Sequence, residues 1–143
     1  MTQMSTQQCW DFLSRHELGR LAYHLIEEVH IVPVNYAVDR HPVSGDRSLL
    51  FRTAEGSKLM GVVMNADVAF EVDELVEDRA ASVIVRGRAR RLEEDEAHRA
   101  EHVPLRPWVA TPKWNVVEIE VAEISGREFE LTRPWRRLIP GEG

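Results

Sequence analysis

Alternating apolar and polar positions are the main pattern of this sequence. In residues 19–25, Leu21, Tyr23 and Leu25 occupy every second position, and this period is typical of a strand with one buried face. The same pattern predicts further strands at residues 29–38, 48–53, 67–73, 81–90, 114–121 and 127–131. Most links between them have hairpin length, which favours a closed or nearly closed antiparallel β-barrel over an alternating βαβ plan.

Turn-forming residues and one proline mark the expected strand limits. Residues 39–46 and Ser125–Gly126 are rich in turn formers, and residues 74–78 predict an acidic, solvated loop. Pro33 falls inside the second predicted strand and has no amide to donate to a central ladder. We therefore expect this strand to be at an edge, bulged, or open on one side at Pro33.

Helical spacing is confined to short segments, so the chain is mainly β with two or three flanking helices. The first helix has a cap at Ser5 or Thr6 and ends near His16. A second begins at Ser57, and a third, highly charged, covers residues 93–102.

The length of 143 residues suits a single domain with a substantial core. Within it we expect a flexible N-terminus over residues 1–8 and a folded domain over residues 9–131. Residues 132–143 are expected to form a C-terminal tail.

Composition excludes several functional classes. A hydrophobic content of 43% and a charged content of 29% are typical of a soluble globular protein, and no apolar run is long enough to span a membrane. A net charge of −6 argues against nonspecific binding to nucleic acid, which requires a basic surface. The single cysteine, Cys9, cannot form an intrachain disulfide, and the start shows no secretory signal. We therefore expect a cytoplasmic protein.

One segment is locally basic. Arg86, Arg88 and Arg90 share one face if residues 81–90 form a strand. We interpret this row as a solvated or subunit-facing surface paired with nearby acids, and its role stays open.

Residues 49–59 combine an apolar strand, a glycine turn and a helix start, and they resemble a cradle for an anion. Arg52 and Lys58 supply positive charge, and Thr53 and Ser57 supply hydroxyl donors. Gly56 allows a tight turn, and the free amides at the start of a helix would add positive potential. A phosphate monoester would suit such a site. The alternative, equally open from these residues alone, is that Ser57 only caps a helix and the two cations are solvated.

Two further charged pairs are weaker candidates. His98 and His102 lie four positions apart on a predicted helix, a spacing that suits metal ligands, but no third ligand is evident and we predict no metal site. Glu118 and Glu120 would share one strand face, and this arrangement is more typical of exposed surface than of an acid/base couple.

Two tryptophans near the last long strand are candidates for ligand contact. Trp108 and Trp114, in a proline-rich stretch, suit either core packing or a flat wall for a planar ligand. The sequence has no nucleophile elbow and no Rossmann glycine motif. No acid, base or nucleophile stands out, so the catalytic residues are unassigned.

Five segments occur in the order and spacing found in the pyridoxamine 5′-phosphate oxidase-like family of flavin-binding split barrels. The chain resembles this family over about residues 9 to 131, and it looks closest to the branch of flavin-dependent nitroreductases and nitroimidazole-resistance proteins. Pro107-Trp108 and Trp114, ahead of the last long strand, add to the resemblance. The five segments are residues 18–22, 30–36, 51–59, 68–73 and 82–89.

The resemblance implies a six- or seven-stranded split barrel that forms a homodimer, with flavin mononucleotide (FMN) at the subunit interface. By position, the phosphate would be held by Arg52, Thr53, Ser57 and Lys58, and Ser82 would contact the flavin from a neighbouring strand. Backbone groups along the ring and ribityl chain would come from Val32, Pro33, Val34 and Asn35. The candidate set of cofactor-binding residues also includes Phe51, Leu59 and Trp114.

The function implied is a flavin-dependent oxidoreductase that passes reducing equivalents from a reduced nicotinamide to a small planar acceptor, such as a nitro compound or quinone. The lack of an evident acid, base or nucleophile suits flavin chemistry, in which the isoalloxazine carries the redox step and the protein supplies position and electrostatics. The alternative is a non-catalytic flavin, deazaflavin or haem carrier or sensor of the same fold. Residues 132–140 lack the Arg-x-His element of true pyridoxamine 5′-phosphate oxidase, which makes vitamin metabolism doubtful.

Overall fold

The computed structural model describes residues 1–54, 66–102 and 114–132, so the helix predicted after Ser57 lies outside the described residues. The chain is mainly β with antiparallel pairing, as the alternation predicts. The elements in order are β1 (Thr2–Gln3), α1 (Thr6–Ser14), β2 (Leu18–Leu25), β3 (Glu28–Arg40), β4 (Arg47–Ala54), β5 (Ala66–Val76), β6 (Arg79–Arg91), the 3-10 helix η1 (Ala97–His102) and β7 (Trp114–Glu130).

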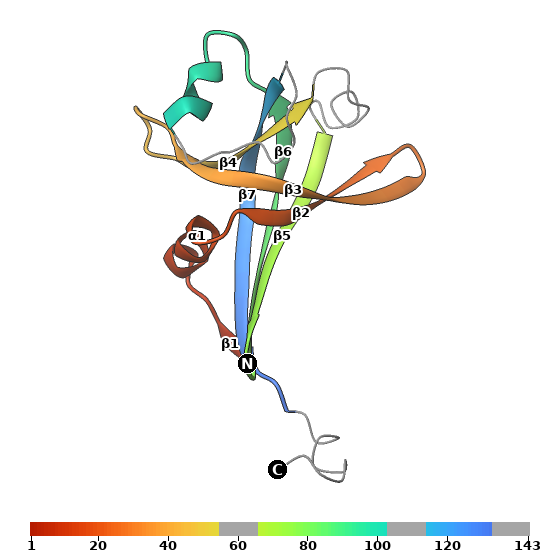
Figure 1. Ribbon diagram of the computed structural model, residues 1–143, viewed down its shortest axis with the longest axis vertical. Coiled ribbons are helices and arrows are strands. Elements are labelled where there is room, and N and C mark those ends of the chain that lie inside the picture. Colours follow the sequence, from red (N-terminus) through yellow and green to blue (C-terminus); the bar gives the residue numbers. More distant parts are fainter. Residues whose placement is uncertain (55–65, 103–113, 133–143) are drawn as a thin grey trace.

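The strands form one sheet that closes on itself. Their order is β1-β7-β4-β3-β2-β5-β6, and an additional pairing of β6 with β7 closes the ring. Beyond the ring, β5, β6 and β7 continue as a long ribbon toward the bottom of Figure 1, while the β2–β3 hairpin projects to one side. The predicted antiparallel barrel is therefore confirmed.

Side chains on the inner face of the ring form the main core. On β4 and β7, Leu49, Phe51, Val117 and Ile119 are at most 1% exposed. Helix α1 adds its own apolar face to this core through Cys9, Phe12 and Leu13. Its N-terminus is fixed by a capping box between Ser5 and Gln8, which selects Ser5 over Thr6 as the cap.

A smaller apolar cluster lies on the outer face of the sheet. Leu50 of β4 and Val116 of β7 pack there against Leu92 and Ala100, with Ala37 of β3 beside them. Because Ala100 belongs to η1, this cluster attaches η1 to the outer face.

Two predicted turns were wrong. Residues 74–78 do not form a solvated loop, because β5 runs to Val76 and a two-residue turn leads into β6. The break expected at Ser125–Gly126 is absent, and β7 continues to Glu130. A Cβ on Gly126 would lie 2.8 Å from the sulfur atoms of Cys9 and Met4, so this glycine permits close approach of the N-terminal segment.

The last predicted helix also differs from expectation. The charged helix predicted over residues 93–102 is reduced to the six-residue η1, preceded by turns. In the segment expected to be flexible, residues 1–8, Thr2 and Gln3 pair with β7 and the first turn of α1 begins at Thr6.

At Pro33, β3 has a strand partner on only one side among the described residues. The ladder with β2 includes Pro33 opposite Arg20, whereas the ladder with β4 covers only Tyr36 to Arg40. In the described part of the chain, the missing amide therefore interrupts no ladder on the β4 side, which agrees with the predicted alternative of a strand open on one side at Pro33.

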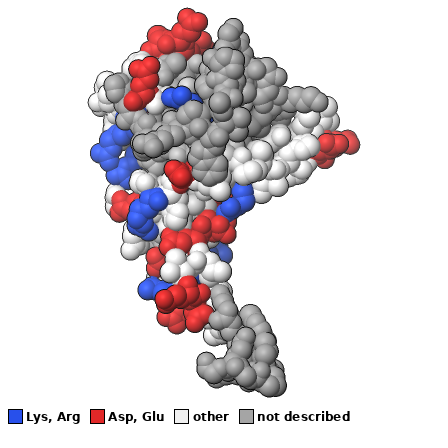
Figure 2. All heavy atoms as spheres, viewed as in Figure 1, with Lys and Arg blue, Asp and Glu red and all other residues white. Residues whose placement is uncertain are grey.

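Acidic and basic side chains are mixed on the face drawn in Figure 2. Acidic residues gather toward the end of the long ribbon, where Glu77, Asp78, Glu128 and Glu130 are exposed. Among the described residues, no helix is both long and apolar enough to cross a membrane.

Candidate functional site

Strand β4 places the predicted cradle residues on both faces of the sheet. Phe51 and Thr53 point inward and are 0% and 6% exposed, whereas Arg52 lies on the outer face opposite Val116 of β7. The side chains of Arg52 and Thr53 therefore lie on opposite sides of β4. Of the two, only Arg52 presents its side chain to a ligand on the outer face.

The Nε atom of Arg52 is buried and has no hydrogen-bond partner among the described residues. Buried polar atoms are almost always paired in folded proteins, and an unpaired one calls for an explanation. A bound anion would provide it, since the guanidinium group recognises phosphate and carboxylate oxygens. This atom is the strongest indication of a ligand site in the described chain.

Strand β3 pairs with β4 up to the position before Arg52 and contains residues 32–35, which are predicted to contact the flavin through their backbone. The ladder between β3 and β4 ends where Tyr36 is opposite Phe51. Asn35 of β3 and Arg52 of β4 are the residues just beyond this last pair. Val32 and Val34 pack against the main core, and Pro33 is exposed. Of residues 32–35, Asn35 is therefore the one that lies next to Arg52 across the two strands.

Other predicted residues lie elsewhere or cannot be placed. Ser57, Lys58 and Leu59 fall outside the described residues, and of Trp114 only the backbone is described, opposite Ala54. Ser82 faces Arg127 on β7, whereas Arg52 faces Val116. Positions 116 and 127 on β7 are roughly 35 Å apart at about 3.3 Å per residue. Within one chain, Ser82 and Arg52 cannot contact the same small ligand.

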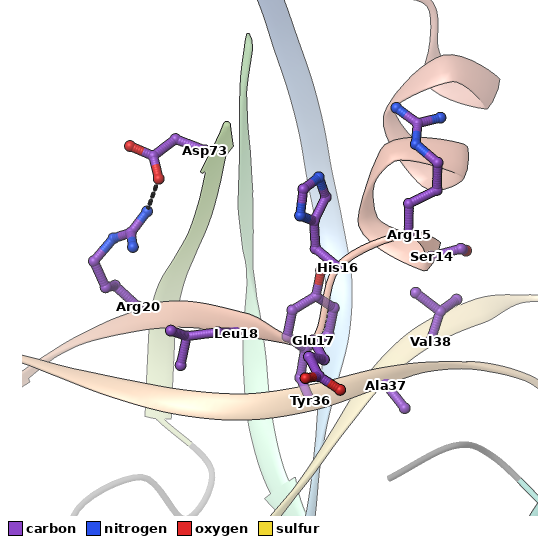
Figure 3. Close-up of a pocket in the computed structure, with 10 residues that line it drawn as sticks. All are labelled: Ser14, Arg15, His16, Glu17, Leu18, Arg20, Tyr36, Ala37, Val38 and Asp73. Carbon is purple, nitrogen blue, oxygen red and sulfur yellow. Dashed lines mark hydrogen bonds and ion pairs between the residues drawn. The ribbon is translucent and has the colours of Figure 1, made fainter. Parts of the chain in front are cut away.

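A pocket of about 720 Å³ lies between the end of α1, the start of β2 and residues 36–38 of β3 (Figure 3). None of the predicted cofactor residues lines it, but Leu18, which does, pairs with Asn35. Its charged groups are largely paired: Arg20 contacts Asp73 at 2.6 Å, and His16 contacts Glu74 at 2.9 Å. We place the candidate site at Arg52 because this pocket contains no unpaired buried polar atom.

The phenol of Tyr36 belongs to the wall of this pocket. It donates a hydrogen bond of 2.6 Å to the carbonyl oxygen of Leu13, and burial raises its pKa well above the usual range. The phenol therefore stays neutral and ties β3 to the end of α1, a structural role.

The expectation that Glu118 is exposed surface was wrong. Glu118 is 4% exposed and pairs with Arg90 and Arg99, whereas Glu120 is exposed and contacts Arg90 at 2.7 Å. The carboxylate of Glu118 tolerates burial because two guanidinium groups neutralise it. The sequence pattern did not indicate that η1 covers this outer face of the strand. This cover buries Glu118.

Two members of the arginine row of β6 pair with nearby acids, as predicted. Arg86 lies 3.9 Å from Glu123 at the surface, and Arg90 contacts Glu96 at 2.8 Å. These contacts assign Arg86 and Arg90 to ion pairs with neighbouring acids.

Comparison with known proteins gives consistent matches over most of the chain. The sequence model of a family described as pyridoxamine 5′-phosphate oxidase matches residues 5–128. The structure of an FAD binding protein from Mycobacterium smegmatis is 37% identical and covers 92% of this chain and 100% of its own, with a TM-score of 0.79. A conserved protein of unknown function from Corynebacterium diphtheriae is 35% identical over 91% of this chain and 98% of its own, with a TM-score of 0.76. An uncharacterized protein of Mycobacterium tuberculosis is 46% identical over 86 residues, which are 59% of this chain and 78% of the relative.

Proposed function

Because this chain belongs to the pyridoxamine 5′-phosphate oxidase family, we propose that it binds a flavin nucleotide and holds the phosphate at Arg52. The observation that carries the proposal is the buried Nε of Arg52, which has no partner among the described residues. An unsatisfied buried donor costs about 1–3 kcal/mol, and a phosphate oxygen would satisfy it. The name of the Mycobacterium smegmatis relative, an FAD binding protein, supports the same class of ligand.

The remaining contacts follow from the position of Arg52. The backbone of residues 32–35 on β3 would run along the ribityl chain and ring, and Ser57 and Lys58 would add to the phosphate site. Beside Arg52, the buried side chain of Leu50 and the partly buried side chain of Val116 would limit the access of water to the phosphate end. This partly dry setting strengthens a charge-assisted hydrogen bond.

Two flavin nucleotides fit this description. The sequence resemblance implies FMN, whereas the Mycobacterium smegmatis relative is named for FAD. Both carry a phosphate on the ribityl chain, so Arg52 suits either. The two are distinguished by what the protein retains on purification.

We further propose that the protein is an oxidoreductase. The bound isoalloxazine would take electrons from a reduced nicotinamide and pass them to a small planar acceptor, such as a nitro compound or quinone. The residues of this chain would bind and orient the flavin and exclude water around its phosphate.

The first prediction is that protein purified without added cofactor carries a flavin or takes one up. We expect an absorption spectrum of oxidised flavin, or quenching of the fluorescence of added FMN or FAD, and the mass of the released cofactor identifies it. Loss of the flavin absorption on addition of a reduced nicotinamide, and its return with a nitro compound or quinone, supports the oxidoreductase. A flavin that no nicotinamide reduces would indicate a carrier, and protein that binds no flavin at all would overturn the proposal.

We also propose that two copies complete the site. Along β3, Val29, Ile31, Pro33 and Asn35 alternate onto one face, which is the face that carries Arg52 on β4. Val29 and Ile31 are 82% and 68% exposed, and burial of such apolar groups favours association. A second copy on this face would cover the flavin, and its Ser82 could approach where that of the same chain cannot.

A further inference from the structure

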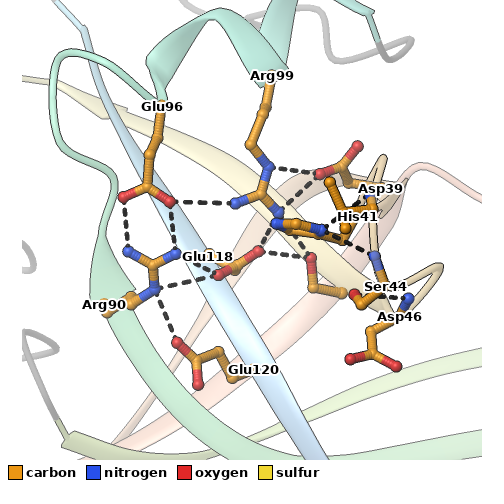
Figure 4. A network of polar contacts seen from close by, with 11 residues as sticks. Asp39, His41, Ser44, Asp46, Arg90, Glu96, Arg99, Glu118 and Glu120 are labelled. Atoms are coloured by element: carbon orange, nitrogen blue, oxygen red, sulfur yellow. Dashed lines mark hydrogen bonds and ion pairs between the residues drawn. The ribbon is translucent and has the colours of Figure 1, made fainter.

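A cluster of charged side chains lies on the outer face beside the candidate site. We call it the Arg99 cluster, and its members are Asp39, Arg90, Glu96, Arg99 and Glu118 (Figure 4). The side chains of Asp39 and Arg99 are each 9% exposed, and that of Glu118 is 6% exposed. Charges this deeply buried require close partners.

The contacts of the cluster occupy both carboxylate oxygens of Glu118. Arg99 and the hydroxyl of Ser48 donate to Oε2, the latter at 2.8 Å, while Nε of Arg90 donates to Oε1 at 3.1 Å. Arg99 is itself held by Asp39, whose Oδ2 accepts from Nε at 2.8 Å. Glu118 therefore points into the cluster and is fully partnered there.

The other arginine is similarly fixed. Arg90 donates to both oxygens of Glu96, at 2.9 and 2.8 Å. This double contact lowers the pKa of the Glu96 carboxyl to about 2, so it stays ionised and continues to hold Arg90.

Glu118 is also a neighbour of Arg52. In the β4–β7 ladder, Leu50 is opposite Glu118 and Arg52 is opposite Val116, so Arg52 and Glu118 are diagonal neighbours on one face. Diagonal neighbours lie about 7–8 Å apart, within reach of two long side chains. No contact between them is formed among the described residues, and Nε of Arg52 is left without a partner.

We propose that Arg99 is a positioning residue that keeps Glu118 away from Arg52, so that the Arg52 guanidinium remains available to the phosphate of a flavin nucleotide. The inference rests on the proposed function. Without Arg99, Oε2 of Glu118 would keep only the neutral hydroxyl of Ser48 as a donor, and the guanidinium of Arg52 would be the next cation within reach of this buried carboxylate. The phosphate would then have to displace a carboxylate.

Three variants test this through the ratio of two affinities, those for FMN and for riboflavin, which has the same ring but no phosphate. Arg99→Met is expected to weaken FMN binding at least about tenfold, with little change for riboflavin, because one charge-assisted contact to the phosphate is lost. Arg99→Met combined with Glu118→Gln is expected to recover most of that loss, because the competing carboxylate is gone. Arg99→Lys, which retains a cation for Glu118, is expected to stay near wild type.

A matched control removes a different arginine of the same strand as Arg52. Arg47 lies five positions before Arg52, roughly 16 Å away at about 3.3 Å per residue, and its guanidinium stacks over Trp10. Arg47→Met is expected to leave both affinities unchanged. If Arg99→Met does not fold, Arg90→Met serves instead, because Arg90 is 29% exposed and its loss also frees an oxygen of Glu118.

The outcomes separate this inference from the proposed function. Wild-type protein that binds neither ligand overturns the proposed function and the inference with it. Wild-type protein that binds FMN, together with an Arg99→Met variant of equal affinity, overturns the inference alone. Equal losses for FMN and riboflavin, or a double variant no better than Arg99→Met, would mean that Arg99 acts only by supporting the fold.

Discussion

Arg52 is the side chain through which the flavin proposal can be tested directly. Arg52→Met removes the buried Nε and its charge, and we expect FMN binding to weaken by roughly ten- to a hundredfold, equivalent to about 1.5–3 kcal/mol. Riboflavin, which has no phosphate, should bind nearly as before. Arg52→Lys keeps the charge but has no Nε donor, so its loss should be intermediate. Fluorescence titration of each variant measures the affinities.

The control for Arg52 is again Arg47→Met on the same strand, which should change neither affinity. A solvated surface cation contributes less than about 1 kcal/mol, so a small effect of Arg52→Met on FMN would place Arg52 in that class. Equal weakening of FMN and riboflavin would indicate a contact to the ring or a general effect on folding. Either result would contradict the assignment of the flavin phosphate to Arg52.

The sequence predicts a ligand role for Arg52, which stays a prediction, but it did not predict the burial of Glu118. Arg52 is conspicuous because a cation, hydroxyl residues and a glycine occur together in residues 49–59. Glu118 follows the ordinary alternation of a strand, and its burial depends on η1, Arg90 and Arg99, which come from distant parts of the chain. Local pattern reports which face a side chain occupies, but tertiary packing decides whether that face is covered.

Two glycines in the long strands have different tolerance for a side chain. A Cβ on Gly87 would lie 2.1 Å from the carbonyl oxygen of Glu120, which is backbone of a paired strand and cannot move away easily. A Cβ on Gly126 would meet only side-chain atoms, of Cys9 and Met4 at 2.8 Å and of Val83 at 3.1 Å, which can shift. We expect Gly87→Ala to destabilise the fold by about 2–3 kcal/mol and Gly126→Ala by about 1 kcal/mol. Urea unfolding midpoints measure both.

Ser125→Ala is a suitable control, since Ser125 is exposed and adjoins Gly126 in the same strand. Its midpoint should match that of the wild type. A Gly87→Ala variant as stable as Ser125→Ala would show that β6 and β7 can separate at the bulge between Arg86 and Gly87.

Element prediction failed where one residue type has two structural uses. The alternation located β2 to β6 correctly, because a period of two persists along each strand. Gly126 was interpreted as a turn, although in β7 it provides room for the N-terminal segment. Similarly, the acidic residues 74–78 suggested a loop, but the β5–β6 ladder extends to Val76 and Arg79 because charged side chains can point into solvent from a paired strand.

For the whole molecule, the sequence predicted the closed antiparallel barrel but not its extensions. Hairpin-length links and alternating strands restrict the topology, so a barrel follows from local signals. The ribbon of β5, β6 and β7 beyond the ring, and the projecting β2–β3 hairpin, depend on where each ladder ends (Figure 1). Only three residues of β2 pair with β5, which leaves the rest of the hairpin beyond the barrel wall.

The projecting hairpin provides the test of assembly. We expect a homodimer that buries the exposed face of β3, so Ile31→Glu should weaken association by placing a charge in an apolar interface. Analytical ultracentrifugation across micromolar concentrations measures the dissociation constant, which we expect to rise at least tenfold, as about 1.4 kcal/mol or more is lost. Val43→Glu is the control, because Val43 is 89% exposed and lies outside this face, in the turn before β4.

Flavin affinity should follow the dimer if two copies complete the site. At protein concentrations where Ile31→Glu is monomeric, we expect weaker binding of both FMN and riboflavin, since the ring and the phosphate would lose the cover of the second copy. This differs from the variants of Arg52 and Arg99, which should affect FMN alone. A wild-type protein that is monomeric at micromolar concentration and still binds flavin tightly would show that one chain suffices. The flavin phosphate would then bind at Arg52 without any contribution from Ser82 of another copy.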